Sequence, residues 1–150
     1  MRSIRTLIGL PVIVNRRRAG RVVRAELSED LTRLSGIWIS SGFFGMRFIS
    51  SENIGTLGAV AVTADHSGSR RKFVSEPFLK RAIGTDGSLI GAITGADIDE
   101  LSFQVDALEL SCGLWDDLLR GRKRIRNFVM NQDKAYVIIG LSEMEKEERR

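Results

Sequence analysis

Short apolar runs alternate with polar residues along the chain and are interrupted by turn residues at close intervals. Alternation of this kind is typical of half-buried β-strands, and many short strands are typical of a small barrel or sandwich. In the first half the pattern predicts polar or glycine-bounded turns at residues 15–18, 28–30 and 42–45. It also predicts five strands, at residues 10–14, 20–27, 34–40, 46–49 and 59–62.

The second half of the chain repeats the pattern of the first, 71 positions later. A glycine opens an alternating run at residues 20–27, and another opens the matching run at residues 91–98. Apolar positions coincide at this offset, without a gap, as far as Leu57 and Phe128. A shared burial pattern is expected where two copies pack the same kind of core. We therefore predict two barrels, each with its opening glycine at a tight bend or β-bulge.

Three segments of the second half depart from a plain repeat. The closing strand, at residues 135–139, is displaced by about five residues, which we attribute to a longer turn at residues 131–134. Residues 114–119 have apolar side chains at three- and four-residue spacings, which predicts a helical turn in place of a strand. Residues 142–150 begin with the spacing of a helix-capping box and predict a short C-terminal helix or a frayed tail.

A polar stretch without an apolar period, at residues 65–72, separates the two copies. Such a stretch is typical of a connecting segment. We expect four parts: a first barrel at residues 1–66, a linker at 67–76, a second barrel at 77–141 and a charged tail at 142–150.

Each copy contains aliphatic, glycine and turn residues in a characteristic order. These residues are Leu10, Pro11, Val12, Ile13, Gly20, Val22, Ile37, Ile39, Ile54 and 58–62 in the first copy, and Ile83, Asp86, Gly87, Ile90, Gly91, Leu108, Leu110, Ile125 and 136–138 in the second. Their order resembles the PRC-barrel, a β-barrel domain shared by the photosynthetic reaction-centre H subunit and the C-terminal half of the ribosome-maturation factor RimM. The second copy departs from this pattern at Arg126, where the first copy has a glycine.

The resemblance covers roughly residues 5–140. It implies an all-β fold of two tandem small PRC-like barrels with short helical turns. It also implies a non-catalytic adaptor that docks onto larger assemblies, which in this family range from RNA-processing to membrane complexes. A non-enzymatic docking or scaffold protein that binds a larger protein assembly is therefore the expected function.

The net charge of +4 is unevenly distributed, because residues 1–72 carry 12 basic and 5 acidic residues, whereas residues 73–150 carry 11 and 14. Arginine clusters suit phosphate, and nearby aromatic rings can stack on bases. The alternative function is therefore an RNA- or ribosome-associated assembly factor, although the acidic second half opposes a continuous binding groove. The residues concerned are Arg16, Arg17, Arg18, Phe43, Phe44, Arg122, Lys123 and Arg124.

Trp38 aligns with Glu109 at the offset of 71 residues. Glutamate is almost never buried unless it is paired, and side chains alternate between the two faces of a strand. We therefore expect both side chains to point outward. An outward tryptophan is typical of a covered surface, formed either between the two barrels or with a partner. Trp38 completes the candidate interaction surface, and a second copy of this chain is an alternative partner.

The residues that usually carry chemistry are scarce. His66 and Cys112 are single and distant from each other in sequence, and no phosphate-binding loop is present. An acidic group at Asp97, Asp99 and Glu100 suggests a small-ligand or cation sensor as a third function, with a solvated edge as the simpler interpretation. We expect no enzymatic activity, no cofactor and no metal. No apolar run reaches the roughly 20 residues of a membrane span, and we expect a cytoplasmic protein without a signal peptide.

Overall fold

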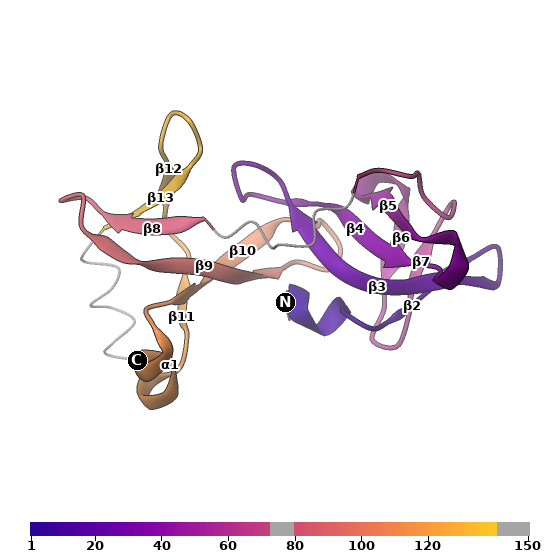
Figure 1. Cartoon of the computed structure of the whole chain (residues 1–150), viewed down its shortest axis with the longest axis horizontal. Coiled ribbons are helices and arrows are strands. Elements are labelled where there is room, and N and C mark those ends of the chain that lie inside the picture. The colour runs from indigo at the N-terminus through magenta and orange to yellow at the C-terminus, as the bar shows by residue number, and fades with distance from the viewer. Residues whose placement is uncertain (73–79, 141–150) are drawn as a thin grey trace. The chain divides into compact units, whose positions relative to one another are not determined.

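The computed structural model describes residues 1–72 and 80–140, apart from the side chain of Phe44. The chain divides into two compact units, the first comprising Met1–Ser75 with Ile98–Val105 and the second Glu76–Asp97 with Asp106–Arg150. Each unit is built on one curled, mixed β-sheet (Figure 1). The prediction of an all-β fold with two tandem barrel-like sheets is confirmed. The helix expected at residues 142–150 lies outside the described residues.

The sheet of the first unit has six strands in the order β5-β4-β3-β2-β7-β6. All neighbouring strands are antiparallel except β2 and β7, which pair in parallel. The strands are β2 (Pro11–Val14), β3 (Arg17–Leu27), β4 (Leu34–Ser40), β5 (Met46–Ser50), β6 (Ile54–Leu57) and β7 (Val62–Ala64). Shorter elements are β1 (Arg2–Ser3) and the 3-10 turns η1 (Ile4–Leu7), η2 (Gly42–Phe44) and η3 (Ser51–Asn53).

The sheet of the second unit follows the same path, in the order β11-β10-β9-β8-β13-β12. Its parallel pair, β8 with β13, corresponds to β2 with β7. The elements are β8 (Arg81–Gly84), β9 (Leu89–Ile98), β10 (Val105–Ser111), α1 (Leu114–Arg120), β11 (Lys123–Ile125), β12 (Val129–Met130) and β13 (Tyr136–Ile139). The strand order therefore repeats, as the sequence predicts.

A β-bulge lies directly before the opening glycine in both units, which confirms the prediction of a bulge at this glycine. The pairing of β2 with β3 shifts register beside Gly20, and the pairing of β8 with β9 shifts beside Gly91. A Cβ atom at Gly20 would come within 2.5 Å of the Ser40 carbonyl oxygen, and one at Gly91 would clash with the Ser111 carbonyl. Only glycine permits so close an approach of the neighbouring strand.

Two predicted segments of the first unit are wrong in part. The turn between β2 and β3 contains only Asn15 and Arg16, both with positive φ, because Arg17 already pairs with Val14. The strand predicted at residues 59–62 is mostly a turn, closed by a 2.9 Å hydrogen bond from the Gly58 N–H to the Ala61 carbonyl. Its small apolar residues resemble a strand, but residues 59–61 lie between β6 and β7, and Val62 is the first residue of β7.

The helical turn predicted at residues 114–119 is confirmed as α1. The gapless alignment beyond it is wrong. Ile49 of β5 pairs with Ile37, and Ile125 of β11 pairs with Leu108, so that Ile125 lies 76 positions after its counterpart. The extra five residues therefore enter at α1 and not at the turn of residues 131–134.

The core of the first unit includes residues that follow the alternation of its strands, such as Val22, Ile37 and Ile39. It also includes Ile98, which is fully buried there although it ends the long strand β9. The segment Ile98–Val105 is fixed in this unit by two backbone hydrogen bonds, from the Leu34 N–H to the Phe103 carbonyl and from the Val105 N–H to the Thr32 carbonyl, each 2.8 Å. The tip of the β9–β10 hairpin is thus part of the first unit.

The expected linker at residues 67–76 is described only as far as residue 72. Its beginning is paired with β5, because Ser69 and Phe48 exchange two backbone hydrogen bonds of 3.0 and 2.8 Å. The Arg47 guanidinium also donates to the Gly68 carbonyl at 3.2 Å. In the described part of the chain, no helix combines the length and the apolar character that crossing a bilayer requires.

The tip of the β9–β10 hairpin contains Asp99, a carboxylate whose pKa is lowered by backbone hydrogen bonds. The N–H groups of Leu101 and Ser102 each donate to Asp99 Oδ1 at 2.8 Å, and these bonds, that of Ser102 first, lower the pKa of Asp99 from 3.8. A carboxylate with a lowered pKa stabilises the folded state at pH values above its pKa in the unfolded chain. This stability is lost as the pH falls through its pKa in the folded state. In an NMR titration we expect both amide resonances to shift with a midpoint below 3.8. Asp99→Asn should abolish the shift, and a midpoint at or above 3.8 would contradict the assignment.

Candidate interaction surfaces

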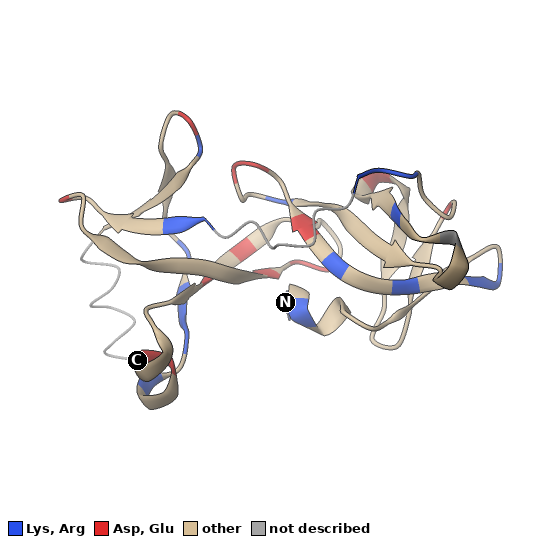
Figure 2. Cartoon of the chain, in the orientation of Figure 1, with Lys and Arg blue, Asp and Glu red and all other residues tan. Residues whose placement is uncertain are grey.

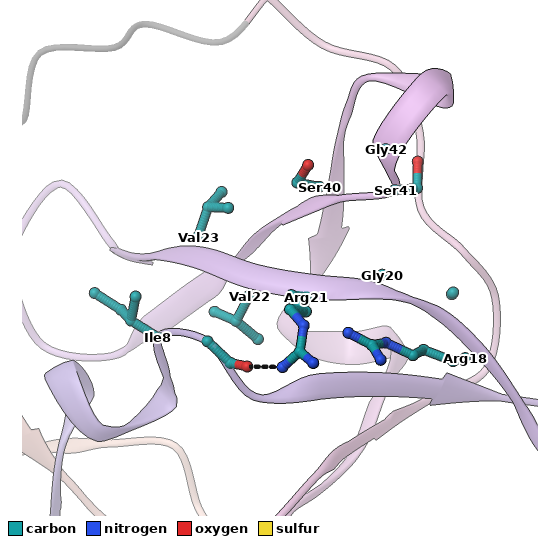
Figure 3. Close-up of a pocket in the computed structure, with 11 residues that line it drawn as sticks. Ile8, Arg18, Gly20, Arg21, Val22, Val23, Ser40, Ser41 and Gly42 are labelled. Carbon is teal, nitrogen blue, oxygen red and sulfur yellow. Dashed lines mark hydrogen bonds between the residues drawn. The ribbon is translucent and has the colours of Figure 1, made fainter.

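An open groove of about 640 Å³ lies along the first part of β3 in the first unit. Its walls come from the loop before β2 (Ile8, Gly9), from β3 (18–23) and from the turn after β4 (40–42) (Figure 3). Arg18 and Arg21 extend from β3 toward the same side in this view, and the Arg21 guanidinium donates to the Gly9 carbonyl at 2.8 Å. The groove therefore brings together the β2–β3 hairpin, which carries the arginines, and the Gly42–Phe44 turn, which is distant from it in sequence.

Basic residues continue from this groove onto the β2–β3 hairpin (Figure 2). Arg16, Arg17 and Arg18 are all exposed, with Arg16 in the turn and the other two on β3. Phe43 follows the groove residue Gly42 and is fully exposed. The first predicted arginine cluster is thus an exposed basic surface with an exposed aromatic ring beside it.

Trp38 lies on the face of β4 opposite Ile37 and Ile39, as its alternation predicts, but it is only 5% exposed. Its ring packs against Phe48 on β5, with 5.2 Å between ring centroids, and the Arg24 guanidinium lies 5.9 Å from its centroid. Its indole N–H donates to Glu26 Oε2 at 2.7 Å. The side chain is therefore covered within its own unit, and its polar atom has a partner.

Glu109 occupies the corresponding position in the second unit and is also only 5% exposed. Arg122 donates to one carboxylate oxygen and Arg124 to the other, each at 2.8 Å, and the Thr94 hydroxyl donates to the first at 2.9 Å. The hydrogen bond to Glu109 is the main cause of a raised Arg122 pKa. The expectation that Glu109 is exposed is wrong, because two guanidinium groups pair the buried carboxylate.

The ion-pair network extends to both sides of Glu109. Arg124 also approaches Asp97 on β9 at 3.2 Å, and Arg122 approaches Asp117 on α1 at 3.5 Å. The second predicted basic cluster therefore differs from the first, since two of its three members are neutralised within the second unit. Lys123 lies between them on β11 and is half-buried.

Helix α1 presents its apolar side to solvent. Asp117 Oδ2 accepts a hydrogen bond from the Ser111 hydroxyl at 2.6 Å in addition to its ion pair with Arg122, so the polar side of the helix is bound to its own unit. The exposed side consists of four large side chains that are 70–81% exposed: Leu114, Trp115, Leu118 and Leu119. This is the reverse of the usual surface helix, whose apolar side faces the core.

No protein-family model matches the chain, and no curated protein matches it.

The other residues considered for chemistry have structural partners. His66 Nδ1 accepts a 3.0 Å hydrogen bond from the Gly68 N–H, and Cys112 is half-buried. Asp97 pairs with Arg124, and Asp99 binds backbone amides at the hairpin tip. Among the residues that the structure describes, no group of three or more His, Cys, Asp or Glu side chains is arranged to hold a metal ion.

Sequence reasoning missed the exposed side of α1. The spacing of the apolar residues between 114 and 119 predicts the helix, and these residues share one side of it. The available signal was the pair Asp116 and Asp117, which lie on the opposite side of the helix. Asp117 accepts a hydrogen bond from Ser111, six residues earlier, and this bond turns the polar side of the helix toward its own unit.

Proposed function

We propose that the protein is a non-enzymatic docking or scaffold protein of the PRC-barrel type, which binds a larger protein assembly. The family assignment is supported by the sequence resemblance and by the repeated mixed sheet with its parallel closing pair. The observation that carries the function is helix α1, which exposes Leu114, Trp115, Leu118 and Leu119 while its aspartates bind its own unit. Large exposed apolar surfaces of this kind mark interaction sites.

The exposed side of α1 fits an apolar groove on a protein partner. Its four anchors, at positions i, i+1, i+4 and i+5, share one side of the helix, and a helix with an apolar side can lie in such a groove. Tryptophan is among the residues that most often dominate binding energy, which makes Trp115 the expected centre of the contact. Arg120, the last residue of α1, is paired with Asp116, and Arg122 just after the helix is paired with Asp117, so apolar burial and not net charge supplies the attraction.

The experiment compares capture of partners from the native cell by the tagged full chain and by two variants. Trp115→Ala is expected to reduce the specifically retained protein at least tenfold, because hot-spot truncations cost about 2 kcal/mol or more. Val60→Ala is the matched control, since Val60 is also large, apolar and 81% exposed but lies in the first unit. Thermal unfolding should be nearly unchanged in both variants, because exposed substitutions alter stability by only about 0.5 kcal/mol.

Two results would separate this proposal from its alternatives. Equal capture by the wild type and by Trp115→Ala would show that α1 is not the docking surface. Sedimentation of the purified chain tests self-association: a dimer that Trp115→Ala dissociates would identify the partner as a second copy of the chain.

A further inference from the structure

We infer that the groove along β3 in the first unit binds single-stranded nucleic acid. This site lies on a different unit from α1, so it goes beyond the docking function proposed above. The inference rests on the charge of the groove, on the small residues that line it and on the exposed ring of Phe43, which follows the groove residue Gly42 in sequence.

The groove has a single sign of charge. Eleven residues line it, and Arg18 and Arg21 are the charged ones among them. Both side chains are exposed, and Arg16 and Arg17 add two more exposed guanidinium groups on the same hairpin. One N–H of Arg21 is used by the Gly9 carbonyl, and a guanidinium has five donors, so this bond fixes its position and leaves further donors for a ligand. Fixed guanidinium groups are the side chains best suited to phosphate oxygens.

Apart from the two arginines and the aliphatic Ile8, Val22 and Val23, the lining is built of small residues. Gly9, Ala19, Gly20, Ser40, Ser41 and Gly42 make up more than half of it. A backbone that lacks bulky side chains allows close approach of a phosphodiester chain. The Ser40 hydroxyl is a polar group that can donate to a phosphate or sugar oxygen, whereas the Ser41 hydroxyl donates to the Gly45 carbonyl at 3.2 Å.

Phe43 supplies the contact that distinguishes a nucleic acid from other anions. It adjoins the groove residue Gly42, and its ring is fully exposed. Proteins that bind single strands combine a basic groove for the backbone with aromatic side chains on which bases stack. An acidic peptide would use the arginines but would gain little from this ring, so the two sets of residues together favour a nucleic acid.

The second unit provides an internal comparison. Its strand β9 has a bulge directly before Gly91, with the same register shift as β3, but the positions equivalent to Arg18 and Arg21 are Leu89 and Ala92. The β8–β9 turn carries Asp86 in place of the arginines, and the Ser88 hydroxyl and N–H hold its pKa below 3.8. The bulge and its glycine therefore belong to the fold, whereas the arginines are additional features of the first unit.

The test uses the full chain and labelled oligonucleotides of roughly eight nucleotides, oligo-U RNA and oligo-dT DNA, with binding followed by fluorescence anisotropy at increasing salt. We expect Arg18→Ala to weaken binding and to reduce the slope of log K against log salt by about 0.7, the value for one phosphate contact on a single strand. Phe43→Ala should weaken binding about fivefold or more and leave the slope unchanged, because stacking releases no counterions.

Arg70→Ala is the matched control, since Arg70 is an exposed arginine of the same unit that does not line the groove. It should change affinity less than twofold. The relative affinities for the RNA and DNA probes identify which nucleic acid the groove prefers, and Trp115→Ala should bind both probes as the wild type does, because α1 serves a different contact.

Three outcomes would overturn the inference. They are the absence of binding at low salt, equal losses for Arg70→Ala and Arg18→Ala, and displacement of the probe by polyglutamate as readily as by unlabelled oligonucleotide. The second would indicate diffuse electrostatic attraction, and the third would indicate a site for acidic peptides. None of these outcomes depends on whether α1 binds a protein.

Discussion

Replacing Arg122 and Arg124 together by alanine is expected to lower the free energy of unfolding of the second unit by about 3–5 kcal/mol. Both side chains are more than one-third exposed, and surface arginines usually contribute little to stability. Here, however, each holds one oxygen of Glu109 at 2.8 Å, and the Glu109 side chain is only 6% exposed. Removing both leaves the carboxylate buried without either guanidinium group, and a buried charge that loses its counterions is strongly destabilising.

Urea denaturation would measure this loss, and hydrogen exchange of the β9 and β10 amides would assign it to the second unit. Adding Glu109→Leu to the double variant should recover most of the stability, because it removes the buried charge. A triple variant as unstable as the double variant would show that lost packing, and not the charge, is the cause. Arg120→Ala is the control, since its 3.8 Å ion pair with Asp116 is exposed and should contribute no more than about 0.5 kcal/mol.

Ile98→Ala is expected to destabilise the first unit by about 2–5 kcal/mol, the usual range for truncating a buried isoleucine. Ile98 is fully buried in the core of that unit, together with residues such as Leu34 and Ile39. The effect should therefore appear in a part of the protein that precedes Ile98 by many residues in sequence.

Hydrogen exchange locates the effect of Ile98→Ala. Protection of the β3 and β4 amides should fall, whereas a loss confined to residues 106–139 would contradict the assignment of the hairpin tip to the first unit. Leu101→Ala provides the comparison, because Leu101 belongs to the same tip but is 94% exposed. It should change stability by about 0.5 kcal/mol or less.

The strands could be predicted where their aliphatic side chains reach a core. The prediction at residues 34–40 coincides with β4, since Leu34, Ile37 and Ile39 are all fully buried. The same reasoning failed at residues 59–61, where small apolar residues follow one another without a packing role and Val60 is 81% exposed; Val62, the last residue of the predicted strand, is buried at the start of β7. Alternation indicates a strand only when the apolar side chains reach a core.

The environment of Glu109 could not be predicted because it depends on a residue offset that changes within α1. At the constant offset of 71, Arg124 aligns with Asn53, a residue outside the strands. The five residues added at α1 place Arg124 opposite Glu109, where the first unit has Phe48 opposite Trp38. The aromatic pair Trp38–Phe48 of the first unit thus corresponds to the ion pair Glu109–Arg124 of the second. Because both partners differ together, the side chain at each of the two equivalent β4 and β10 positions has a matching neighbour and can be buried.

The candidate surfaces were predicted less completely than the fold. The triple arginine and Phe43 are exposed, as a binding surface requires, whereas Trp38 is covered by Phe48 and Arg24. A single sequence gives the spacing of the apolar residues of α1, but it does not state which side of the helix faces the protein. That side is determined by Asp117, through its contacts with Ser111 and Arg122.

The position of Ile98–Val105 in the first unit has a consequence for the order of events during synthesis. A translated chain usually folds its N-terminal domain first, as soon as that domain has emerged. Here the emergence of residues 1–72 does not supply the whole core, because Ile98 belongs to it and the Leu34 N–H bonds to Phe103. The first unit can complete its packing only after the first long hairpin of the second copy has been made, so the maturation of the two units is coupled in time.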